Sequence, residues 1–429
     1  MKKFILSILL LPNLVSAQIN QDSVATLPKT ALDVYYNMHT GQKDTVRANN
    51  WQLAFAVRKA QYPMNTLQAT TIRINDGQGI EVYQSNKTVN DWASFDTTGY
   101  AAWPSPINDD KTWDIGAFNQ SKNMQDPFDY GWGAYNMNSK EVVGKNIWLL
   151  TNSNRSLMKK LYVSKIVFDT LWQFTISNLD GTDSNTIEIS KPAFKGKLFA
   201  YYNVLSNSVI DREPNAGSWN LLFTKYKTVV TMMGQTMPYP VMGVLMSPNT
   251  MGARVKDANV ANMEIGKAAD SALFTHQINT IGWDWKVAGV PGLAPMVDSL
   301  GFFLHDLNAP TTNTRIIFTE YFSNGSSQYT KFNLFTYSLQ TTGMEQNLNN
   351  AVQWNIYPNP INGNAQLSIE SSEMNAAQLS ITALDGKSVF EQTISGTNQS
   401  IQLPGLQCGV YLVNWVSQNK QTSKKLVVY

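Results

Sequence analysis

The sequence predicts an all-β protein with a small β-sandwich at its C-terminus. Short alternating or β-branched segments recur along the chain, and turn signals such as Asn75-Asp76-Gly77 and Asp180-Gly181 separate them. The aromatic content is high, with 12 Trp, 18 Tyr and 18 Phe. Wide β layers bury such large flat side chains. The length of 429 residues suggests two or three domains.

The first 17 residues have the features of a cleavable signal peptide. Lys2 and Lys3 precede an apolar run at 4–11, and Val15-Ser16-Ala17 supplies the small residues of a cleavage site. The run is too short to cross a bilayer, so we expect no transmembrane segment. An N-terminal core strand is the alternative. We expect export and cleavage after Ala17.

Charge and cysteine content exclude several classes of partner. Lys and Arg total 33 against 31 acids, and loss of Lys2 and Lys3 with the leader would leave 31 of each sign. This neutral balance gives no reason to expect nucleic acid or an anionic membrane as a partner. The single cysteine rules out a disulfide within the chain, and three histidines are too few for a multi-histidine metal centre. We therefore expect no metal site.

The body of the chain repeats its own sequence pattern. Residues 33–37 (DVYYN) have a counterpart at 199–203 (FAYYN), 166 positions later, and residues 50–55 (NWQLAF) match 218–223 (SWNLLF) at a spacing of 168. A nearly constant offset is what a duplication with small loop changes leaves. Chance agreement between common strand patterns is the alternative.

The repeat predicts two tandem β units, at 18–190 and 191–340. Strands are expected in both units because bulky and smaller residues alternate or β-branched residues cluster. The clearest of these segments are 51–55, 70–74, 79–83, 162–168, 219–223 and 332–339.

The composition changes near residue 341. Residues 341–351 are polar and aperiodic, which suits a linker. Residues 352–429 alternate in short stretches, with Asp385-Gly386 as a hairpin turn, and predict a small β-sandwich. Its strands are expected at 365–370, 377–384, 388–394, 400–403, 409–416 and 424–429.

Four motifs in this tail occur in a specific order. They are Tyr357-Pro358-Asn359-Pro360, Leu384-Asp385-Gly386-Lys387, Gly409-Val410-Tyr411-Leu412, and Lys424-Lys425 before an apolar end. With them, the tail resembles the C-terminal sorting domain of the type IX (Por) secretion system. The resemblance implies recognition by the type IX machinery at the outer membrane, then release or attachment at the cell surface, commonly with tail removal. An ordinary carbohydrate-binding or immunoglobulin-like module is the alternative.

The body is similar to a second family. Residues 51–55 (WQLAF), 219–226 (WNLLFTKY) and 315–321 (RIIFTEY) look like strands of the HmuY family of secreted haem-binding proteins. The likeness covers 191–340, with a weaker echo over 18–190. It implies a predominantly β fold and capture of haem between two axial side chains, histidine or methionine.

Four residues are candidate haem ligands. Met237 and Met242 flank the segment 237–243 (MPYPVMG), which we expect to form a rigid apolar loop after the Trp219 strand. His276 and His305 are weaker candidates. Thioether sulfur can bind haem iron, but methionine also fills irregular core gaps, so packing is the alternative for each. We expect weak haem binding through the loop.

Enzymatic motifs are missing from the sequence. It contains no G-x-S-x-G, H-E-x-x-H or P-loop pattern. The neighbouring acids Asp109-Asp110 and Asp211/Glu213 could in principle serve a glycosidase, but we expect solvated loops there. The sequence therefore predicts a non-enzymatic, secreted or cell-surface ligand-binding protein, with haem as the family-implied ligand. A surface adhesion or carbohydrate-binding protein without haem chemistry is the alternative.

Overall fold

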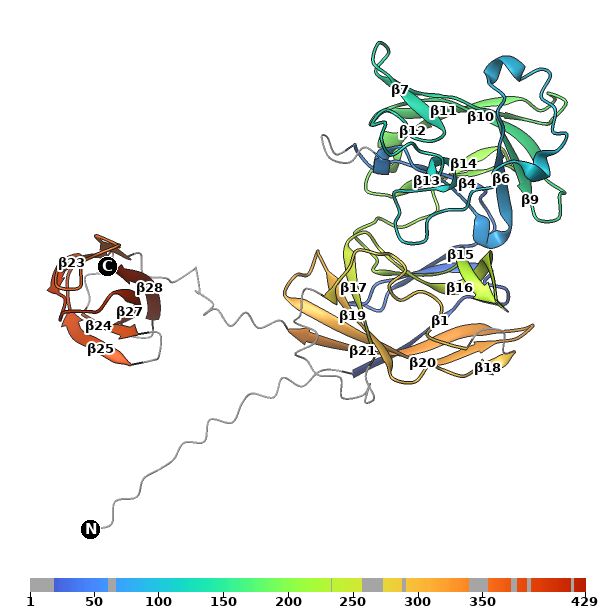
Figure 1. Cartoon of the computed structure of the whole chain (residues 1–429). Helices are drawn as coiled ribbons and strands as arrows, with labels where there is room; N and C mark the ends of the chain where they lie inside the picture. Colours follow the sequence, from blue (N-terminus) through green and yellow to red (C-terminus); the bar gives the residue numbers. More distant parts are fainter. Residues whose placement is uncertain are drawn as a thin grey trace. The chain divides into compact units, whose positions relative to one another are not determined.

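The computed structural model divides into two compact units, the body (Met1–Leu339) and the tail (Gln340–Tyr429) (Figure 1). The division falls beside the expected linker at 341–351. That linker and the expected leader at 1–17 lie outside the residues that the structure describes. The described residues are 19–60, 67–232, 234–256, 273–287, 291–338, 354–371, 376–383, 387–417 and 420–429.

Both units consist of β-strands, so the all-β prediction is confirmed. Within the described ranges the only helical segments are short 3₁₀ turns. They are η1 (Leu67–Ala69), η2 (Asp76–Gln78), η3 (Val89–Asp91), η4 (Tyr100–Ala102), η5 (Ala117–Asn119) and η6 (Lys191–Phe194).

Four sheets form the body. One has seven strands, in the order β12-β11-β10-β8-β7, with β9 added beside β10 and β6 beside β9. Two have four strands, β14-β13-β4-β5 and β16-β15-β2-β3. The last has six strands, β1-β21-β20-β19-β17, with β18 added beside β20.

The strand bounds of the body follow in chain order. They are β1 (Ile19–Ala25), β2 (Leu32–Tyr36), β3 (Lys43–Arg47), β4 (Leu53–Ala56), β5 (Ile72–Ile74), β6 (Ile80–Gln84), β7 (Gly133–Asn136), β8 (Glu141–Gly144), β9 (Trp148–Asn152), β10 (Met158–Val167), β11 (Leu171–Ser177), β12 (Asn185–Ser190), β13 (Phe199–Asn203), β14 (Ser208–Ile210), β15 (Leu221–Met232), β16 (Gln235–Met246), β17 (Thr250–Lys256), β18 (Gly292–Ala294), β19 (Leu300–Asp306), β20 (Thr312–Ser323) and β21 (Gln328–Ser338).

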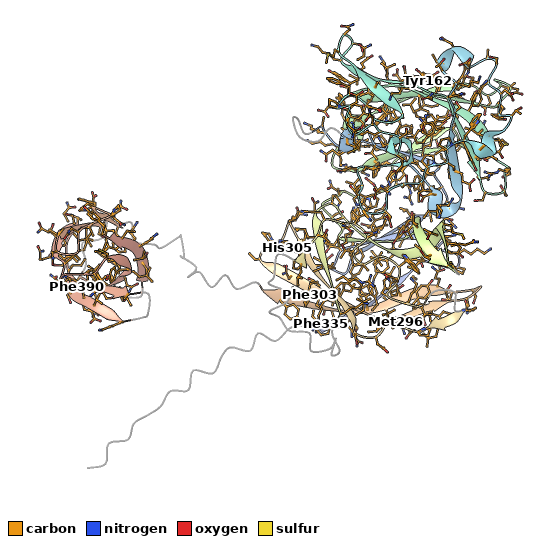
Figure 2. The ribbon with its side chains drawn as sticks, viewed as in Figure 1. Tyr162, Met296, Phe303, His305, Phe335 and Phe390 are labelled. Carbon is orange, nitrogen blue, oxygen red and sulfur yellow. The ribbon has the colours of Figure 1, made fainter. Side chains whose placement is uncertain are left out.

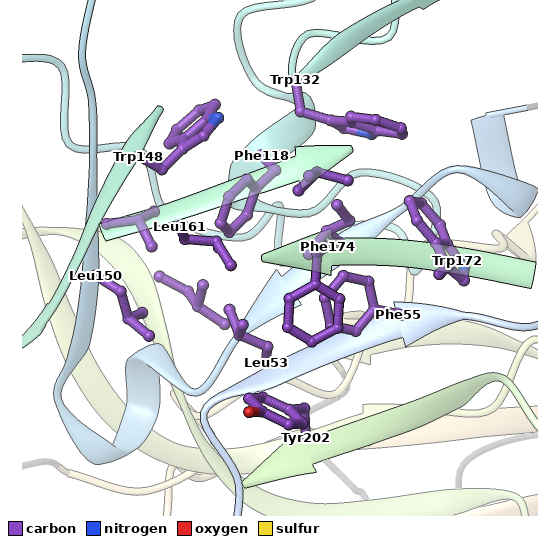
Figure 3. Close-up of a cluster of buried hydrophobic side chains, with 14 of the residues drawn as sticks. Leu53, Phe55, Phe118, Trp132, Trp148, Leu150, Leu161, Trp172, Phe174 and Tyr202 are labelled. Atoms are coloured by element: carbon purple, nitrogen blue, oxygen red, sulfur yellow. The ribbon is translucent and has the colours of Figure 1, made fainter. Parts of the chain in front are cut away.

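The sheets of the body stack in four layers (Figure 1), and a separate apolar core fills each interface between layers. The seven-stranded sheet packs on β14-β13-β4-β5 through a core that contains Phe55, Trp172 and Phe174 (Figure 3). The two four-stranded sheets pack on each other around Tyr35 and Trp219. A third core joins β16-β15-β2-β3 to the six-stranded sheet.

The layers make two β-sandwiches that use the chain differently. Every strand of the upper one lies between residues 53 and 210, and we call it the contiguous sandwich. The lower one combines β1, β2 and β3 with β15 to β21, so its strands come from both ends of the body. We call it the split sandwich.

The repeated segments occupy equivalent positions in the two sandwiches. Residues 34–36 of β2 pair with 221–223 of β15, and residues 200–202 of β13 pair with 53–55 of β4. Each Tyr-Tyr strand of one repeat therefore lies beside the Trp-x-Leu strand of the other repeat. Positions 34 and 200 are 166 apart and positions 53 and 221 are 168 apart, so the two pairings have the same register.

The strands that flank each Tyr-Tyr strand follow the same rule. Tyr36 pairs with Lys43 in the β2–β3 hairpin, and Tyr202 pairs with Val209 in the β13–β14 hairpin. In both hairpins the two paired residues are seven positions apart in the sequence. The strand that precedes each hairpin also pairs with a strand of the other repeat: β1 pairs with β21, and β12 pairs with β11. The first three strands of each repeat thus complete the sandwich of the other repeat.

This exchange corrects the expected tandem division at residue 190. A boundary there would separate β2 from β15 and β4 from β13, which are hydrogen-bonded neighbours. The sequence could not reveal the exchange because both repeats carry nearly the same strand, and either copy has the residues to pair with either Trp-x-Leu strand.

The strands of the central layers are buried on both faces. In β4, Leu53 and Phe55 face the core of the contiguous sandwich, while Ala54 and Ala56 face the interface between the two four-stranded sheets. The same double burial holds for β2, whose last four residues are all buried. This double burial explains why consecutive residues in these segments are apolar, instead of polar and apolar residues alternating.

The tail is a small β-sandwich, as predicted. Its two sheets, β22-β23-β26 and β25-β24-β27-β28, enclose a core in which the rings of Trp354 and Trp415 lie 5.5 Å apart. The expected turn at Asp385-Gly386 lies outside the described residues. The strands are β22 (Trp354–Tyr357), β23 (Gln366–Ser371), β24 (Ala377–Ala383), β25 (Ser388–Ile394), β26 (Asn398–Gln402), β27 (Gly409–Ser417) and β28 (Lys420–Val428).

Candidate functional sites

The tail brings its terminal motifs together. Asn359 of the Tyr-Pro-Asn-Pro motif joins the last strand, since its Nδ2 donates to the Lys425 carbonyl at 2.7 Å and its Oδ1 accepts the Val427 N–H at 2.9 Å. Gly409 begins β27 directly opposite Val428. Residues that lie 66 positions apart in the sequence therefore form one edge of the domain.

Much of this edge is accessible. Tyr357 is 49% exposed, and Pro358, Asn359, Pro360 and Lys425 are also exposed. Lys424 differs, because its stem lies against the sandwich and its Nζ is 5.9 Å from the Trp354 ring. The edge offers a partner an aromatic side chain, two prolines and a cation.

The predicted haem ligands do not converge. Met237 and Met242 lie on strand β16, not on a loop, which corrects the expected loop at 237–243. They are five positions apart, so their side chains point to opposite faces of the sheet and their Cα atoms are about 16 Å apart. Met237 is 38% exposed, whereas Met242 packs against the core of the split sandwich. These two thioethers cannot bind the same haem iron.

The two candidate histidines lie elsewhere on the split sandwich. His305 is near the end of β19 (Figure 2), its ring centre lies 6.2 Å from that of Phe274, and its Nδ1 is 2.8 Å from Asn313 Oδ1. His276 is exposed and follows Thr275, which bridges to Gly252 of β17. Neither histidine lines the grooves described below. Within the described residues, no group of three or more His, Cys, Asp or Glu side chains could hold a metal ion.

A buried polar network lies between the two four-stranded sheets. Arg212 forms an ion pair with Asp33 at 2.7 Å, and both side chains are below 10% exposed. Thr224 donates to the second carboxylate oxygen at 2.6 Å. The cavity beside them holds about 60 Å³, enough for a few waters. This network is therefore a means of joining the sandwiches rather than a ligand site.

Glu213 belongs to the same interior layer, which corrects the expectation of a solvated loop at Asp211/Glu213. Its carboxylate accepts the N–H groups of Leu198 and Phe199 and the hydroxyl of Tyr201. Burial raises its pKa to about 7, against the opposing effect of these hydrogen bonds. Asp211 is half-exposed and pairs with Lys197, so the two acids do not face each other across a cleft.

A hollow whose charged lining residues are mainly cations lies between the two sandwiches. It is a cleft of about 830 Å³, formed where the chain passes between the sandwiches. We call it the basic cleft. Among the described residues that line it, five are cations and one, Asp169, is an acid. The cations are Arg58, Lys59, Lys191, Lys195 and Lys197.

The cations of the basic cleft differ in how far their side chains are buried and already bonded to the protein. Arg58 pairs with Asp114 at 2.6 Å, yet its Nε is buried and has no hydrogen-bond partner among the described residues. Lys191 is almost fully buried, donates to the Ala69 carbonyl at 3.1 Å, and has its pKa lowered to about 8 by that burial. Lys59 and Lys195 are exposed and form no ion pair with a described residue.

The charge of this cleft is not balanced locally. Among the described residues, the carboxylates that line it or pair with its cations are Asp169, Asp114 and Asp211, and they leave an excess of two positive charges. A concave surface of one sign concentrates ligands of the opposite sign. Sequence reasoning missed this site because the chain as a whole has a formal net charge of only +2. The three lysines at 191, 195 and 197 were the available signal.

A second hollow lies on the split sandwich. This groove of about 490 Å³ has walls from Tyr239, Trp283 and Tyr321, and we call it the aromatic groove. Met242 lines it but Met237 does not. Lys286 lies at the groove with its side chain largely buried.

Comparison with known proteins identifies the tail. Residues 355–429 match the secretion system C-terminal sorting domain. The chain is therefore secreted and attached at the cell surface through the type IX system. No helix among the described residues is long and apolar enough to cross a membrane. The sequence has no significant match among curated proteins.

Solved structures resemble the chain only distantly. PorZ, a surface component of the type IX secretion system of Porphyromonas gingivalis, matches at 11% identity and a TM-score of 0.16, covering 71% of this chain and 46% of PorZ. A polysaccharide lyase matches at 10% identity and the same TM-score, covering 61% of this chain and 39% of the lyase. The chain thus spans less than half the length of either protein.

Proposed function

We propose that the body is a non-enzymatic binding module that holds an acidic polysaccharide in the basic cleft after export to the cell surface. The observation that carries this proposal is the cleft itself, in which five cations face a hollow of about 830 Å³ in an otherwise neutral chain. The sorting domain delivers the body to a place where polysaccharides are accessible. This choice favours the carbohydrate-binding alternative over haem capture.

The arrangement of the cations suits a polymer with repeated charges. Arg58 and Lys191 are held by the fold, so they offer pre-positioned donors for one anionic group. Lys59 and Lys195 are exposed and can follow neighbouring charges along a chain. Because exposed charges are screened by salt, such binding must weaken as ionic strength rises.

Binding to defined polymers tests the proposal. We expect the purified body and tail to bind polygalacturonate or heparin at 50 mM salt, to lose most of that affinity at 500 mM, and to ignore neutral dextran. The double substitution Lys59→Gln with Lys195→Gln should weaken binding at least tenfold. The matched control is Lys87→Gln with Lys140→Gln, two exposed lysines outside the cleft.

Two outcomes would contradict the proposal. One is equal loss of affinity in the control variant, which would mean that only net charge matters. The other is tighter binding to a short DNA duplex than to either acidic polysaccharide, which would point to a different class of polyanion.

Haem remains a prediction without a defined site. Met242 alone could reach a ligand in the aromatic groove. A Soret change on haem titration that survives Met237→Ala but is lost in Met242→Ala would support such binding, whereas no Soret change in the unmodified protein would end it.

A further inference from the structure

The aromatic groove is built from three separate segments of the split sandwich. Strand β16 contributes Tyr239 and Pro240, the segment after β17 contributes Trp283 and Pro291, and the end of β20 contributes Tyr321. Tyr239 is 46% exposed, so the groove is open to solvent on that side. A groove of about 490 Å³ with aromatic walls matches the size and lining of small-molecule sites.

Among the described residues that line this groove, Lys286 is the one with a charged side chain. Lys286 is 7% exposed, and its Nζ donates to the carbonyls of Met242 at 2.8 Å and Trp283 at 3.1 Å. The same Nζ lies 4.0 Å from the ring centre of Trp285 and 4.7 Å from that of Tyr321. An ammonium has three N–H groups, so one remains after both carbonyl bonds are made.

The charge of Lys286 has no counterion in the described part of the chain. The nearby acid, Asp284, is held by both terminal nitrogens of Arg254, at 2.7 and 3.0 Å. Burial lowers the pKa of Lys286 to about 7, against the opposing attraction of Asp284. A carboxylate that entered the groove would offset this cost through a charge-assisted hydrogen bond.

We propose that the aromatic groove binds a small organic carboxylate with a ring-sized body, whose carboxylate accepts a hydrogen bond from Lys286 and whose ring lies against Tyr239 and Trp283. The ring supplies flat surface to the aromatic walls, and the carboxylate supplies the missing counterion. This site is separate from the basic cleft, and the two share no lining residue. An experiment that contradicts the polysaccharide proposal therefore does not test this one, and the reverse also holds.

Calorimetry with paired ligands tests this proposal on the whole secreted protein. Phenylacetate is compared with phenylacetamide, and glucuronate with glucose, because each pair differs mainly in the carboxylate. We expect at least one carboxylate to bind at least tenfold more tightly than its uncharged partner. The two pairs then distinguish an aromatic acid from a sugar acid. Equal affinities within both pairs, or no binding by either acid, would overturn the proposal.

Substitution of the lysine is the second measurement. Lys286→Met keeps the length of the side chain and removes its charge, so we expect at least a tenfold loss of carboxylate affinity. The matched control is Lys331→Met, at a lysine that is half-exposed and pairs with Glu320. Unchanged affinity in the first variant, or an equal loss in both, would overturn the proposal.

Proton uptake gives a readout that needs no variant. The titratable groups around the groove are Lys286, the Asp284–Arg254 pair, Tyr239 and Tyr321. An incoming carboxylate favours the charged form of the lysine, so binding near pH 8 should take up close to one proton, measured from the dependence of the heat on buffer ionisation. Binding without proton uptake would overturn the role of Lys286 even if Lys286→Met failed to fold.

Discussion

The contiguous sandwich and the split sandwich have corresponding strand orders but draw their strands from the chain in different ways. In the contiguous sandwich every pairing joins residues between 53 and 210. In the split sandwich Ile19 pairs with Phe335, across 316 positions. Loop closure of this kind slows folding more than it destabilises the folded state. We therefore infer that the contiguous sandwich forms first and that the split sandwich closes around it.

The links between the strands explain why the exchange is favoured. Residues 48–52 join β3 to β4, so Arg47 and Leu53 can be at most about 20 Å apart. If β4 paired with β2 in the register that β15 uses, those two ends would lie about 16 Å apart on opposite sides of β2. The link would then have almost no slack to pass over a strand whose two faces are buried.

The largest expected effect comes from cutting the chain between the repeats, after Asp180 in the turn between β11 and β12. Residues 18–180 should not form a folded monomer, because their own β2 cannot reach β4. Mixed with residues 181–339 they should form a 1:1 complex, measured by size-exclusion chromatography, with native packing of the aromatic side chains, measured by near-UV circular dichroism.

A lengthened link is the control for this experiment. Eight Gly and Ser residues inserted after Asn50 should allow residues 18–180 to pair their own strands and to gain monomeric structure. A stable monomer of residues 18–180 without the insertion would show that the short link does not enforce the exchange.

Equivalent core positions offer a finer comparison of the two sandwiches. Phe55 and Phe223 correspond in the repeat, and both are fully buried, each in the core of its own sandwich. Truncation of either to alanine should lower the free energy of unfolding by about 3–5 kcal/mol. In each variant, denaturant unfolding should show a single transition for both sandwiches, because the apolar core around Tyr35 and Trp219 joins them. Two separate transitions in either variant would mean that the sandwiches unfold independently.

The repeat, the strands and the sorting tail were accessible from sequence because each depends on local residue patterns. The Tyr-Tyr and Trp-x-Leu segments identified equivalent strands, and the Tyr-Pro-Asn-Pro motif identified the tail. Strand partners were not accessible, since register and sheet order depend on links such as 48–52. The basic cleft was missed for a related reason: Arg58 and Lys195 are distant in sequence and meet only through the exchange.

The ion pair of Arg212 and Asp33 marks where the two repeats differ. Asp33 occupies the position that Phe199 occupies in the other repeat, 166 residues later. Arg212→Met should leave the carboxylate of Asp33 buried without its cation and cost about 3–5 kcal/mol of stability, measured by urea denaturation. The double variant with Asp33→Asn should recover part of this loss. No recovery would assign the effect to lost packing of the long side chain instead of to the buried charge.

The pH dependence of stability gives the smallest expected effect and comes from Glu213, in the layer between the sandwiches. Its folded pKa is raised from 4.5 to about 7, so the folded state holds a proton that the unfolded state releases. Stability should therefore be greatest below about pH 4.5, fall as the pH rises to about 7, and then level off. The loss is at most about 3 kcal/mol.

Glu213→Gln should flatten this part of the profile in thermal denaturation between pH 4.5 and 7, whereas Glu188→Gln, at an exposed position, should leave it unchanged. Acids such as Asp22 and Asp129 have lowered pKa values, so their contributions are lost only at lower pH and do not mask the effect. Burial also raises the pKa of Asp76, so a Glu213→Gln variant that retains the full slope would assign the proton to Asp76 instead.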